Sequence, residues 1–306
     1  MEKSMNHQIP EKKQFLTSAA WIIMLAVSML PDAIFQEITG GRPAWLIWVK
    51  ISLLAVLIGG SMILDRIRPL RNYIILILAI FAFEEAVSHI RVMSWWQDLF
   101  GEPADTFSAG MLSIQSGRLL VTFLMIGTLA LLGYSKKDFF LTPGNLKAKI
   151  KPVRWLGFPK ADPWTSFGGQ FAIYISLGTL LFLILAGKPS LSAVKLTLPV
   201  IPMILLLAAM NAFSEEMTYR ASLLAGLEPV LGYRQSLWIT AAFFGIAHYF
   251  GVPYGIPGVI MASFLGWMMG KAMLETRGMF WAWLIHFLQD ILIFFFMAMG
   301  TVVPGG

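Results

Sequence analysis

Three clusters of acidic, basic and imidazole side chains interrupt apolar stretches near the carboxyl end of this sequence. A charged or strongly polar side chain in such a stretch is costly in a membrane, so each cluster is a candidate functional site. The clusters are Asn211-Ala212-Phe213-Ser214-Glu215-Glu216-Met217-Thr218-Tyr219-Arg220, then Phe244-Gly245-Ile246-Ala247-His248, and finally His286-Phe287-Leu288-Gln289-Asp290.

Helical spacing predicts how the side chains of each cluster are directed. Glu216 and Arg220 are four residues apart, so they share a helix face and can form an ion pair. Glu215 points about 100° away from that pair and is left free for another partner. The same spacing of four stacks His286 on Asp290 in the third cluster.

The second cluster, Phe244 to His248, repeats the spacing of four, so the aromatic ring can shield the imidazole. A carboxylate and an imidazole can share a water molecule and act as its general base in amide hydrolysis. A second imidazole with a neighbouring donor can stabilise the oxyanion of the tetrahedral intermediate. Alternatively, Glu215, His248 and His286 would be three ligands of Zn²⁺ with water as the fourth. The sequence contains no HExxH motif and leaves both chemistries open.

The composition indicates that a bilayer surrounds much of the chain. Of 306 residues, 57% are hydrophobic and 13% are charged, and the mean hydropathy is +0.71. Soluble domains carry roughly twice this fraction of charge. The absence of cysteine excludes disulfides, thiolate metal sites and a cysteine nucleophile. The net charge of +6 comes from loops between apolar runs, so we expect no nucleic-acid partner.

Nine apolar runs approach the length of about 20 residues that a membrane-spanning helix requires. We therefore expect an all-α, polytopic transmembrane bundle of eight or nine spans, with the functional site in the carboxyl-terminal helices. The predicted spans are 15–37, 44–64, 72–90, 115–134, 167–187, 194–216, 236–250, 258–275 and 280–299, the seventh and eighth being short.

Basic residues alternate between the loops in a way that predicts the orientation. With a cytoplasmic amino end, the inside segments hold seventeen of the 23 Lys and Arg residues and the outside segments hold three. Arg118 is among the three that fall within or at the ends of spans. The inside segments are 1–14, 65–71, 135–166, 217–235 and 271–279.

The order of the clusters resembles the CAAX protease and bacteriocin-processing family (CPBP or Abi), which includes the Ras-converting CAAX prenyl endopeptidase. The resemblance rests on Glu-Glu-x-x-x-Arg, Phe-x-x-x-His and His-x-x-x-Asp on successive apolar segments, over about 212–292. It implies three regions: an amino-terminal four-span region (1–134), a basic cytoplasmic linker (135–166) and an intramembrane protease core (167–306).

The resemblance also implies roles for individual residues. Glu215 corresponds to the catalytic glutamate, and His248 to its partner in activating water. His286 and Asp290 correspond to the pair that holds the oxyanion. Asp290 departs from the Asn usual in the eukaryotic branch, and an ionised Asp cannot donate a hydrogen bond, so it would be protonated or would orient His286.

The same resemblance implies supporting roles for three further residues. Glu216 and Arg220 correspond to the structural half of the first motif, and Phe244 precedes the histidine of the second. Ala221 replaces a Gly that is frequent in the family, which is a small change.

A second double glutamate, Glu84-Glu85, lies four residues before His89 and close to Arg91. No family motif matches it, so we interpret it as a structural or regulatory salt-bridge cluster, with a second metal site as the alternative.

The predicted span boundaries place Glu215 near the inner face and His248 near the outer end of a short helix, although the proposed chemistry requires them to lie close together. We expect the short helix to be tilted or shallow, and 221–232 to be an amphipathic link at the inner surface.

These observations predict a hydrolase, an intramembrane endopeptidase that cleaves a peptide bond near the cytoplasmic leaflet with water activated by glutamate and histidine. The family has historically been described as metalloproteases, but we expect no cofactor, with Zn²⁺ as the alternative. The expected partners are a peptide or lipid-modified protein substrate and membrane lipids, and the expected location is a prokaryotic plasma membrane. The competing hypotheses are a proton- or ion-coupled transporter and a non-catalytic immunity or scaffold protein.

Overall fold

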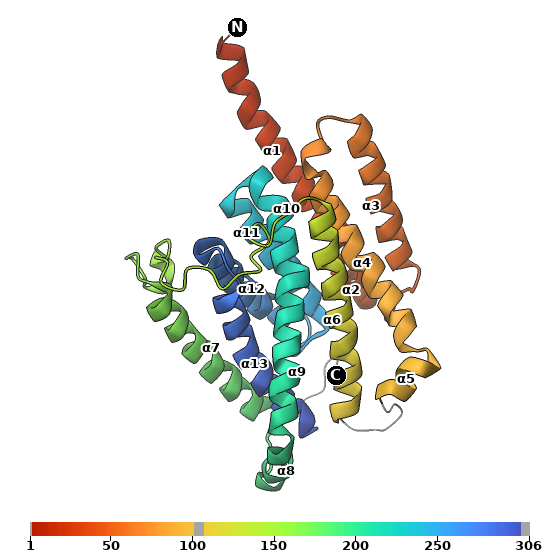
Figure 1. Cartoon of the computed structure of the whole chain (residues 1–306), viewed down its shortest axis with the longest axis vertical. Coiled ribbons are helices and arrows are strands. Elements are labelled where there is room, and N and C mark those ends of the chain that lie inside the picture. The colour runs from red at the N-terminus through yellow and green to blue at the C-terminus, as the bar shows by residue number, and fades with distance from the viewer. Residues whose placement is uncertain (1, 101–106, 301–306) are drawn as a thin grey trace.

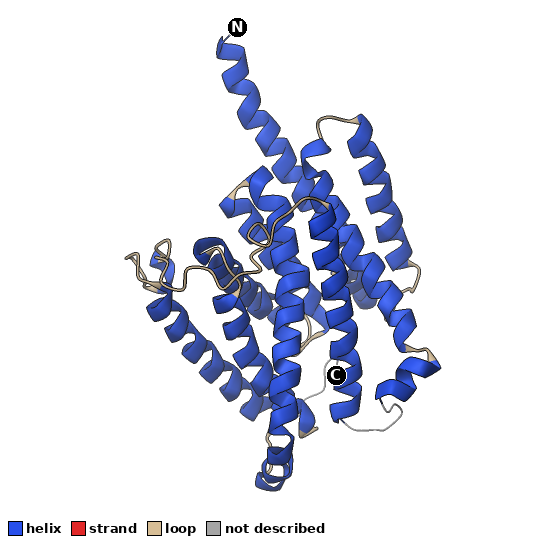
Figure 2. Cartoon of the chain, viewed as in Figure 1, coloured by secondary structure: helices blue, strands red, loops and turns tan. Residues whose placement is uncertain are grey.

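The computed structural model describes residues 2–100 and 107–300, with side chains from residue 11 onwards. Helices make up nearly all of this part of the chain, and it contains no named strand (Figure 2). The helices before the linker are α1 (Glu2–Val27), α2 (Leu30–Thr39), α3 (Leu46–Ile63), α4 (Arg71–Arg91), α5 (Ser94–Phe100) and α6 (Phe107–Leu131). Those after it are α7 (Trp164–Gly187), α8 (Leu191–Thr197), α9 (Ile201–Glu215), α10 (Ser222–Leu231), α11 (Tyr233–Ala247), α12 (Ile256–Thr276) and α13 (Phe280–Ala298).

Short helical turns connect several of these elements. Four are 3-10 turns, and η4 is a π-helical turn that joins α9 to α10. Their bounds are η1 (Arg68–Leu70), η2 (Arg154–Leu156), η3 (Leu198–Val200), η4 (Glu216–Ala221) and η5 (His248–Phe250).

Seven helical segments of the described chain are long and apolar enough to cross a bilayer, and the bent pair α1–α2 makes an eighth if it is one span. The all-α polytopic bundle is thereby confirmed. The expected maximum of nine spans was wrong because α11 has only 15 residues. At 1.5 Å per residue such a helix reaches roughly 22 Å, short of the hydrocarbon thickness of about 30 Å.

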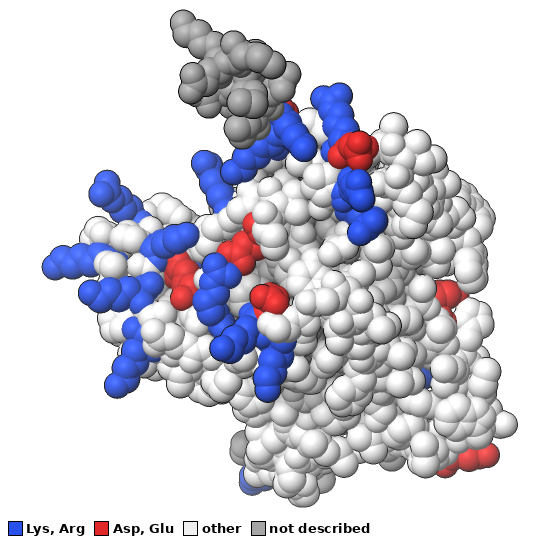
Figure 3. Space-filling view, turned by 45° about the horizontal axis from the view of Figure 1, so that its top comes forward, with Lys and Arg blue, Asp and Glu red and all other residues white. Residues whose placement is uncertain are grey.

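The predicted inside loops gather at one end of the molecule. The amino end, the turn between α3 and α4, the linker after α6 and the turn between α12 and α13 all lie toward the top of Figure 1. Lys and Arg side chains cluster over this end in Figure 3, and we call it the basic face. The structure therefore agrees with the alternation of charged loops. Which compartment the basic face meets stays a prediction.

The linker is fastened to the carboxyl-terminal helices through one carboxylate. Glu275 of α12 accepts hydrogen bonds from the Lys151 backbone N–H (3.1 Å), Trp164 Nε1 (3.1 Å) and Tyr233 Oη (2.8 Å). It also pairs with Lys271, one turn earlier on α12. A buried carboxylate with several donors is stable only in a fixed arrangement, so this end of the linker has a defined position.

The sixth predicted span does not end where the charged cluster begins. Residues 191–231 form one largely helical segment through α8, α9, η4 and α10. Leu223, Leu224 and Leu227 of α10 are completely buried. The expected amphipathic link at 221–232 was therefore wrong, because its leucines pack inside the bundle instead of lying on a membrane surface.

The helices around the charged clusters come from both halves of the chain. α9 packs against α6 and α13, and α6 packs against α4, which also contacts α10. The most extensive cluster of buried hydrophobic residues runs from Leu16 in α1 to Ile285 in α13. The amino-terminal helices α4 and α6 are thus in a position to contribute side chains to a site built around α9.

Candidate active site

Glu215 is the last residue of α9, and the π-helical turn η4 starts immediately after it. Sixteen residues separate Glu215 from Leu231 at the end of the helical segment, which corresponds to roughly 24 Å. Glu215 therefore lies inside the bundle and not at the inner surface. Single π-helical turns inside α-helices are frequent at functional sites, because they change which side chains share a face.

Glu216 forms the predicted pair with Arg220 and binds a second partner as well. Arg220 Nη1 donates to Glu216 Oε1, and His286 Nδ1 lies 2.8 Å from the same oxygen. Glu216 is completely buried, and Arg220 and His286 are nearly so. Buried charges are tolerated when they are paired and hydrogen-bonded, and here the pair also fixes the orientation of the His286 ring.

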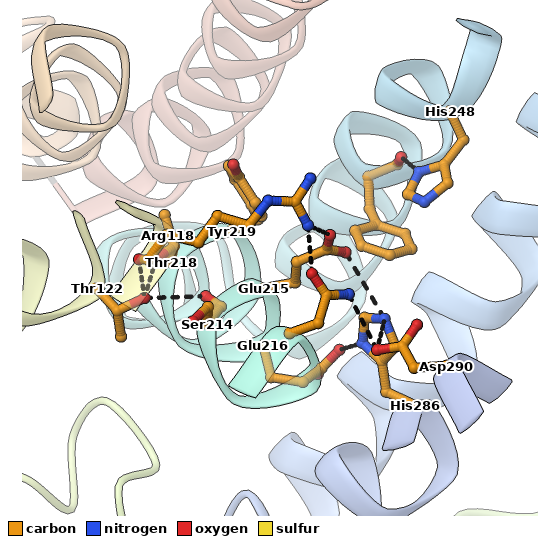
Figure 4. Close-up of polar contacts among 12 residues, drawn as sticks. Arg118, Thr122, Ser214, Glu215, Glu216, Thr218, Tyr219, His248, His286 and Asp290 are labelled. Carbon is orange, nitrogen blue, oxygen red and sulfur yellow. Dashed lines mark hydrogen bonds and ion pairs between the residues drawn. The ribbon is translucent and has the colours of Figure 1, made fainter. Parts of the chain in front are cut away.

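His286 presents its other nitrogen to two more carboxylates. Its Nε2 lies 3.6 Å from Glu215 Oε2 and 3.6 Å from Asp290 Oδ2. Figure 4 shows Glu215 and Asp290 on either side of the ring. Because Glu216 accepts from Nδ1, Nε2 is the nitrogen directed at the space between the other two carboxylates. The first and third sequence clusters therefore meet at one imidazole.

Arg118 of α6 is a member of the site that the sequence analysis did not assign. Its Nη1 lies 2.5 Å from Glu215 Oε1 and also donates to Asn211 Oδ1. Asn211 Nδ2 in turn donates to Asp290 Oδ2 at 2.9 Å. Arg118, Asn211 and Asp290 thus complete a ring of polar contacts with Glu215 and the imidazole of the third cluster. The sequence could have indicated this role, because a charged Arg within an apolar stretch is costly unless it has a partner.

Phe244 separates the two histidines. Its ring centroid is 4.4 Å from that of His248 and 6.0 Å from that of His286, the latter edge-on. The guanidinium carbon of Arg220 lies 4.4 Å from the Phe244 centroid, a distance typical of a cation–π contact. The Phe244 ring therefore contacts the Arg220 guanidinium and also shields His248, as the spacing of four residues between Phe244 and His248 predicted.

His248 stands next to the polar network but is not joined to it by a direct contact. Its Nδ1 lies 2.8 Å from the Phe244 carbonyl oxygen. A carbonyl oxygen only accepts, so Nδ1 carries the proton and Nε2 is free to accept one. Among the described residues, no hydrogen bond or ion pair links His248 to Glu215, so their predicted cooperation stays a prediction.

The two glutamates on α4 have different partners. Tyr219 Oη of η4 donates to Glu84 Oε1, which ties Glu84 to the site. Glu85 instead lies 3.6 Å from His89 on its own helix, and the His89 side chain is 64% exposed. The interpretation as a local salt-bridge cluster therefore fits Glu85 and His89, whereas Glu84 belongs to the site.

A cavity of about 240 Å³ adjoins Glu215 between α4, α6 and the α9–η4 junction. Polar and charged side chains make up much of its wall, so it can hold a polar ligand. The lining residues are Glu84, Val87, Ser88, Arg91, Ile114, Gly117, Arg118, Val121, Ser214, Glu215, Thr218 and Tyr219.

The three ligands of the alternative zinc site are not gathered around one point. Within residues 2–100 and 107–300, no three His, Asp or Glu side chains are arranged to hold a metal ion. This includes the set of Glu215, His248 and His286, in which no hydrogen bond or ion pair of the described residues joins His248 to the other two. The described arrangement of these side chains is therefore not that of an assembled zinc centre, and the expected absence of a cofactor stays a prediction.

The comparison with known families selects the same region of the chain. Residues 197–292 match the family described as type II CAAX prenyl endopeptidase Rce1-like. No curated protein and no solved structure matches the chain. The matched range contains Glu215, His248, His286 and Asp290, whereas Arg118 lies outside it. The match covers about the carboxyl-terminal third of the chain and is consistent with the resemblance to the CAAX protease and bacteriocin-processing family.

Proposed function

We propose that this protein is an intramembrane endopeptidase in which Glu215 activates a water molecule to attack a peptide bond. The observation that carries the proposal is the position of His286, whose Nδ1 is held by Glu216 while its Nε2 faces Glu215. A carboxylate base next to an oriented imidazole is the arrangement that amide hydrolysis needs.

In the proposed reaction, Glu215 takes a proton from the water as the oxygen bonds to the carbonyl carbon. The carbonyl electrons move to the oxygen, and a protonated His286 Nε2 donates a hydrogen bond to that oxyanion. When the tetrahedral intermediate collapses, the C–N bond breaks and the leaving amine receives the proton from Glu215. The carboxylate is thereby restored. His248 Nε2, which is free to accept a proton, is proposed to help orient the water.

Two further residues are proposed to position these groups. Arg118 binds one oxygen of the Glu215 carboxylate and so directs the other toward His286. Asp290 accepts from Asn211 and lies beside His286 Nε2, so we assign it the orientation of the imidazole and not donation to the oxyanion.

The proposed chemistry uses a water activated by a carboxylate and requires no metal ion. We propose a peptide or lipid-modified protein as the substrate, in a prokaryotic plasma membrane with the basic face toward the cytoplasm. We propose that cleavage occurs near the cytoplasmic leaflet, because the α12–α13 turn, which precedes the helix that carries His286, lies toward the basic face (Figure 1).

The test is cleavage of a degenerate peptide library by the purified chain in nanodiscs, followed by mass spectrometry. We expect the native chain to cleave, Glu215→Gln to retain only a small residual rate and the matched control Glu85→Gln to retain full cleavage. Treatment with a strong chelator is expected to leave the rate unchanged. Equal cleavage by Glu215→Gln, or ion flux across vesicles without any cleavage by the native chain, would overturn the proposal.

A further inference from the structure

The cavity beside Glu215 extends well beyond the catalytic groups. On α4 it runs from Glu84 to Arg91, which are seven residues apart and therefore on the same helix face. Seven residues correspond to roughly 10 Å along the helix. Because α4 leads away from the basic face in Figure 1, Arg91 lies nearer the opposite end of the molecule than Glu84 does.

The charges on the wall of this cavity are not all compensated. Arg118 is paired with Glu215, and Glu84 accepts a hydrogen bond from Tyr219. Arg91, by contrast, has no ion pair within the described ranges 2–100 and 107–300, and its Nε is buried without a hydrogen-bond partner. The Arg91 side chain is half-buried, and a guanidinium without a carboxylate partner can bind an anion in the cavity through its remaining N–H groups.

A second polar group in the same wall also lacks a partner. Ser214 is 2% exposed, and its Oγ has no hydrogen-bond partner in the described chain. Ser214 directly precedes Glu215, and both residues line the cavity. Buried hydroxyl groups are ordinarily hydrogen-bonded, so the wall next to the proposed base holds a second polar group whose hydrogen bonding is incomplete.

The position of Arg91 depends on a glycine in the facing helix. A Cβ atom at Gly117 of α6 would come within 2.9 Å of Arg91 Cδ and 3.1 Å of Val87 Cγ1. Glycine at 117 therefore allows the Arg91 side chain to lie against α6 along the cavity wall.

We propose that the cavity is a binding subsite for a carboxylate of the peptide substrate, held by Arg91 about 10 Å along α4 from Glu84. A guanidinium binds a carboxylate with two parallel hydrogen bonds, which gives both strength and direction. The proposal rests on the proposed function, because a peptide bond must lie at Glu215 while the acidic group reaches Arg91. The peptide between them would pass the part of the cavity wall that Ser214 lines.

The experiment measures equilibrium binding of small probes to the full chain in phosphatidylcholine nanodiscs by ligand-observed NMR. The probes are N-acetyl-dialanine as the free acid, the same compound as its amide, N-acetyl-aspartic acid α-amide with its side-chain carboxylate free, and glycerol 3-phosphate. The second tests the need for a charge. The third distinguishes a side-chain carboxylate from a terminal one, and the fourth represents a lipid phosphate.

We expect a carboxylate probe to bind at least about tenfold more tightly than the amide, because hydrogen bonds to charged groups contribute this much or more. Arg91→Gln removes the difference. The matched control Lys188→Gln changes an exposed cation at the same end of the molecule, outside the cavity, and retains it.

Three results would overturn the subsite. They are equal binding of acid and amide by the native chain, an unchanged difference in Arg91→Gln, and tighter binding of glycerol 3-phosphate than of either carboxylate probe. Because these measurements involve no cleavage, they are independent of the catalytic proposal. A chain that binds the acid through Arg91 but cleaves nothing refutes the function, and a chain that cleaves but does not distinguish acid from amide refutes the subsite.

Discussion

The chain contains two double glutamates, each on an apolar helix and each four residues before a possible partner. Glu85 pairs with His89 on its own helix, and this pair is open to the surroundings. Glu216 pairs with Arg220 on its own segment but also with His286, which comes from α13. The same local spacing thus yields a surface pair in one place and a buried junction between helices in the other. The proposed catalytic role depends on the second kind of contact.

Burial separates the two pairs further. Arg220 and Glu216 have side-chain exposures of 1% and 0%, whereas His89 is 64% exposed. Exposed pairs gain little because water screens their attraction. Buried pairs are costly to break, because the remaining charge has no substitute for its partner.

The largest effect is therefore expected from breaking the buried pair. Arg220→Met leaves the buried Glu216 with His286 as its remaining ionisable partner and should lower the free energy of unfolding by about 3–5 kcal/mol. Thermal unfolding in detergent measures the change. A loss below about 1 kcal/mol would show that the pair is less buried than the structure indicates.

Arg118 tests whether the amino-terminal helices take part in the reaction. Arg118→Ala should lower kcat about a hundredfold with little change in KM, because a misplaced catalytic group costs a factor of this order. Arg118→Lys should keep part of the activity, and free guanidinium should restore part of it to Arg118→Ala. A structural defect would instead change thermal stability and would not respond to guanidinium.

Glu84 is expected to have a smaller influence than Arg118, because its contact is with Tyr219 and not with the proposed base. Tyr219→Phe removes one hydrogen bond to a carboxylate, and we expect a several-fold loss of kcat/KM. Steady-state rates on the best library peptide measure this. A loss as large as that of Arg118→Ala would assign Tyr219 a more direct role.

The exposed pair supplies the smallest expected effect. His89→Ala should change the free energy of unfolding by less than about 0.5 kcal/mol and should leave cleavage unaltered. The same unfolding and cleavage assays serve for this variant. A clear loss of activity would mean that the exposed pair has a function that its geometry does not show.

Periodicity and hydropathy predicted most of the fold and the local part of the site. The spacing of four correctly indicated the contact between Glu216 and Arg220, and the one between Phe244 and His248. The end of the sixth span was misplaced, because charged residues were interpreted as leaving the membrane. The leucines within residues 222–231 indicated instead that the span continues, because an apolar run follows the charged residues.

The contacts that cross between helices were beyond prediction from one sequence. Arg118 is 97 residues from Glu215, and Tyr219 is 135 residues from Glu84. Their pairing depends on α6 and α4 packing beside α9 and α10, which no local pattern specifies. A charged side chain within an apolar stretch is costly, so the sequence predicts that Arg118 and Glu84 each have a partner. It does not predict which residue that partner is.

The convergence of Glu215 and His286 is tested most directly by a double-mutant cycle on kcat/KM. Residues that act as one unit give strongly non-additive losses. We predict that Glu215→Gln combined with His286→Ala is no slower than the slower single variant. Losses that multiply would show that the two side chains act independently, and would contradict a shared active site.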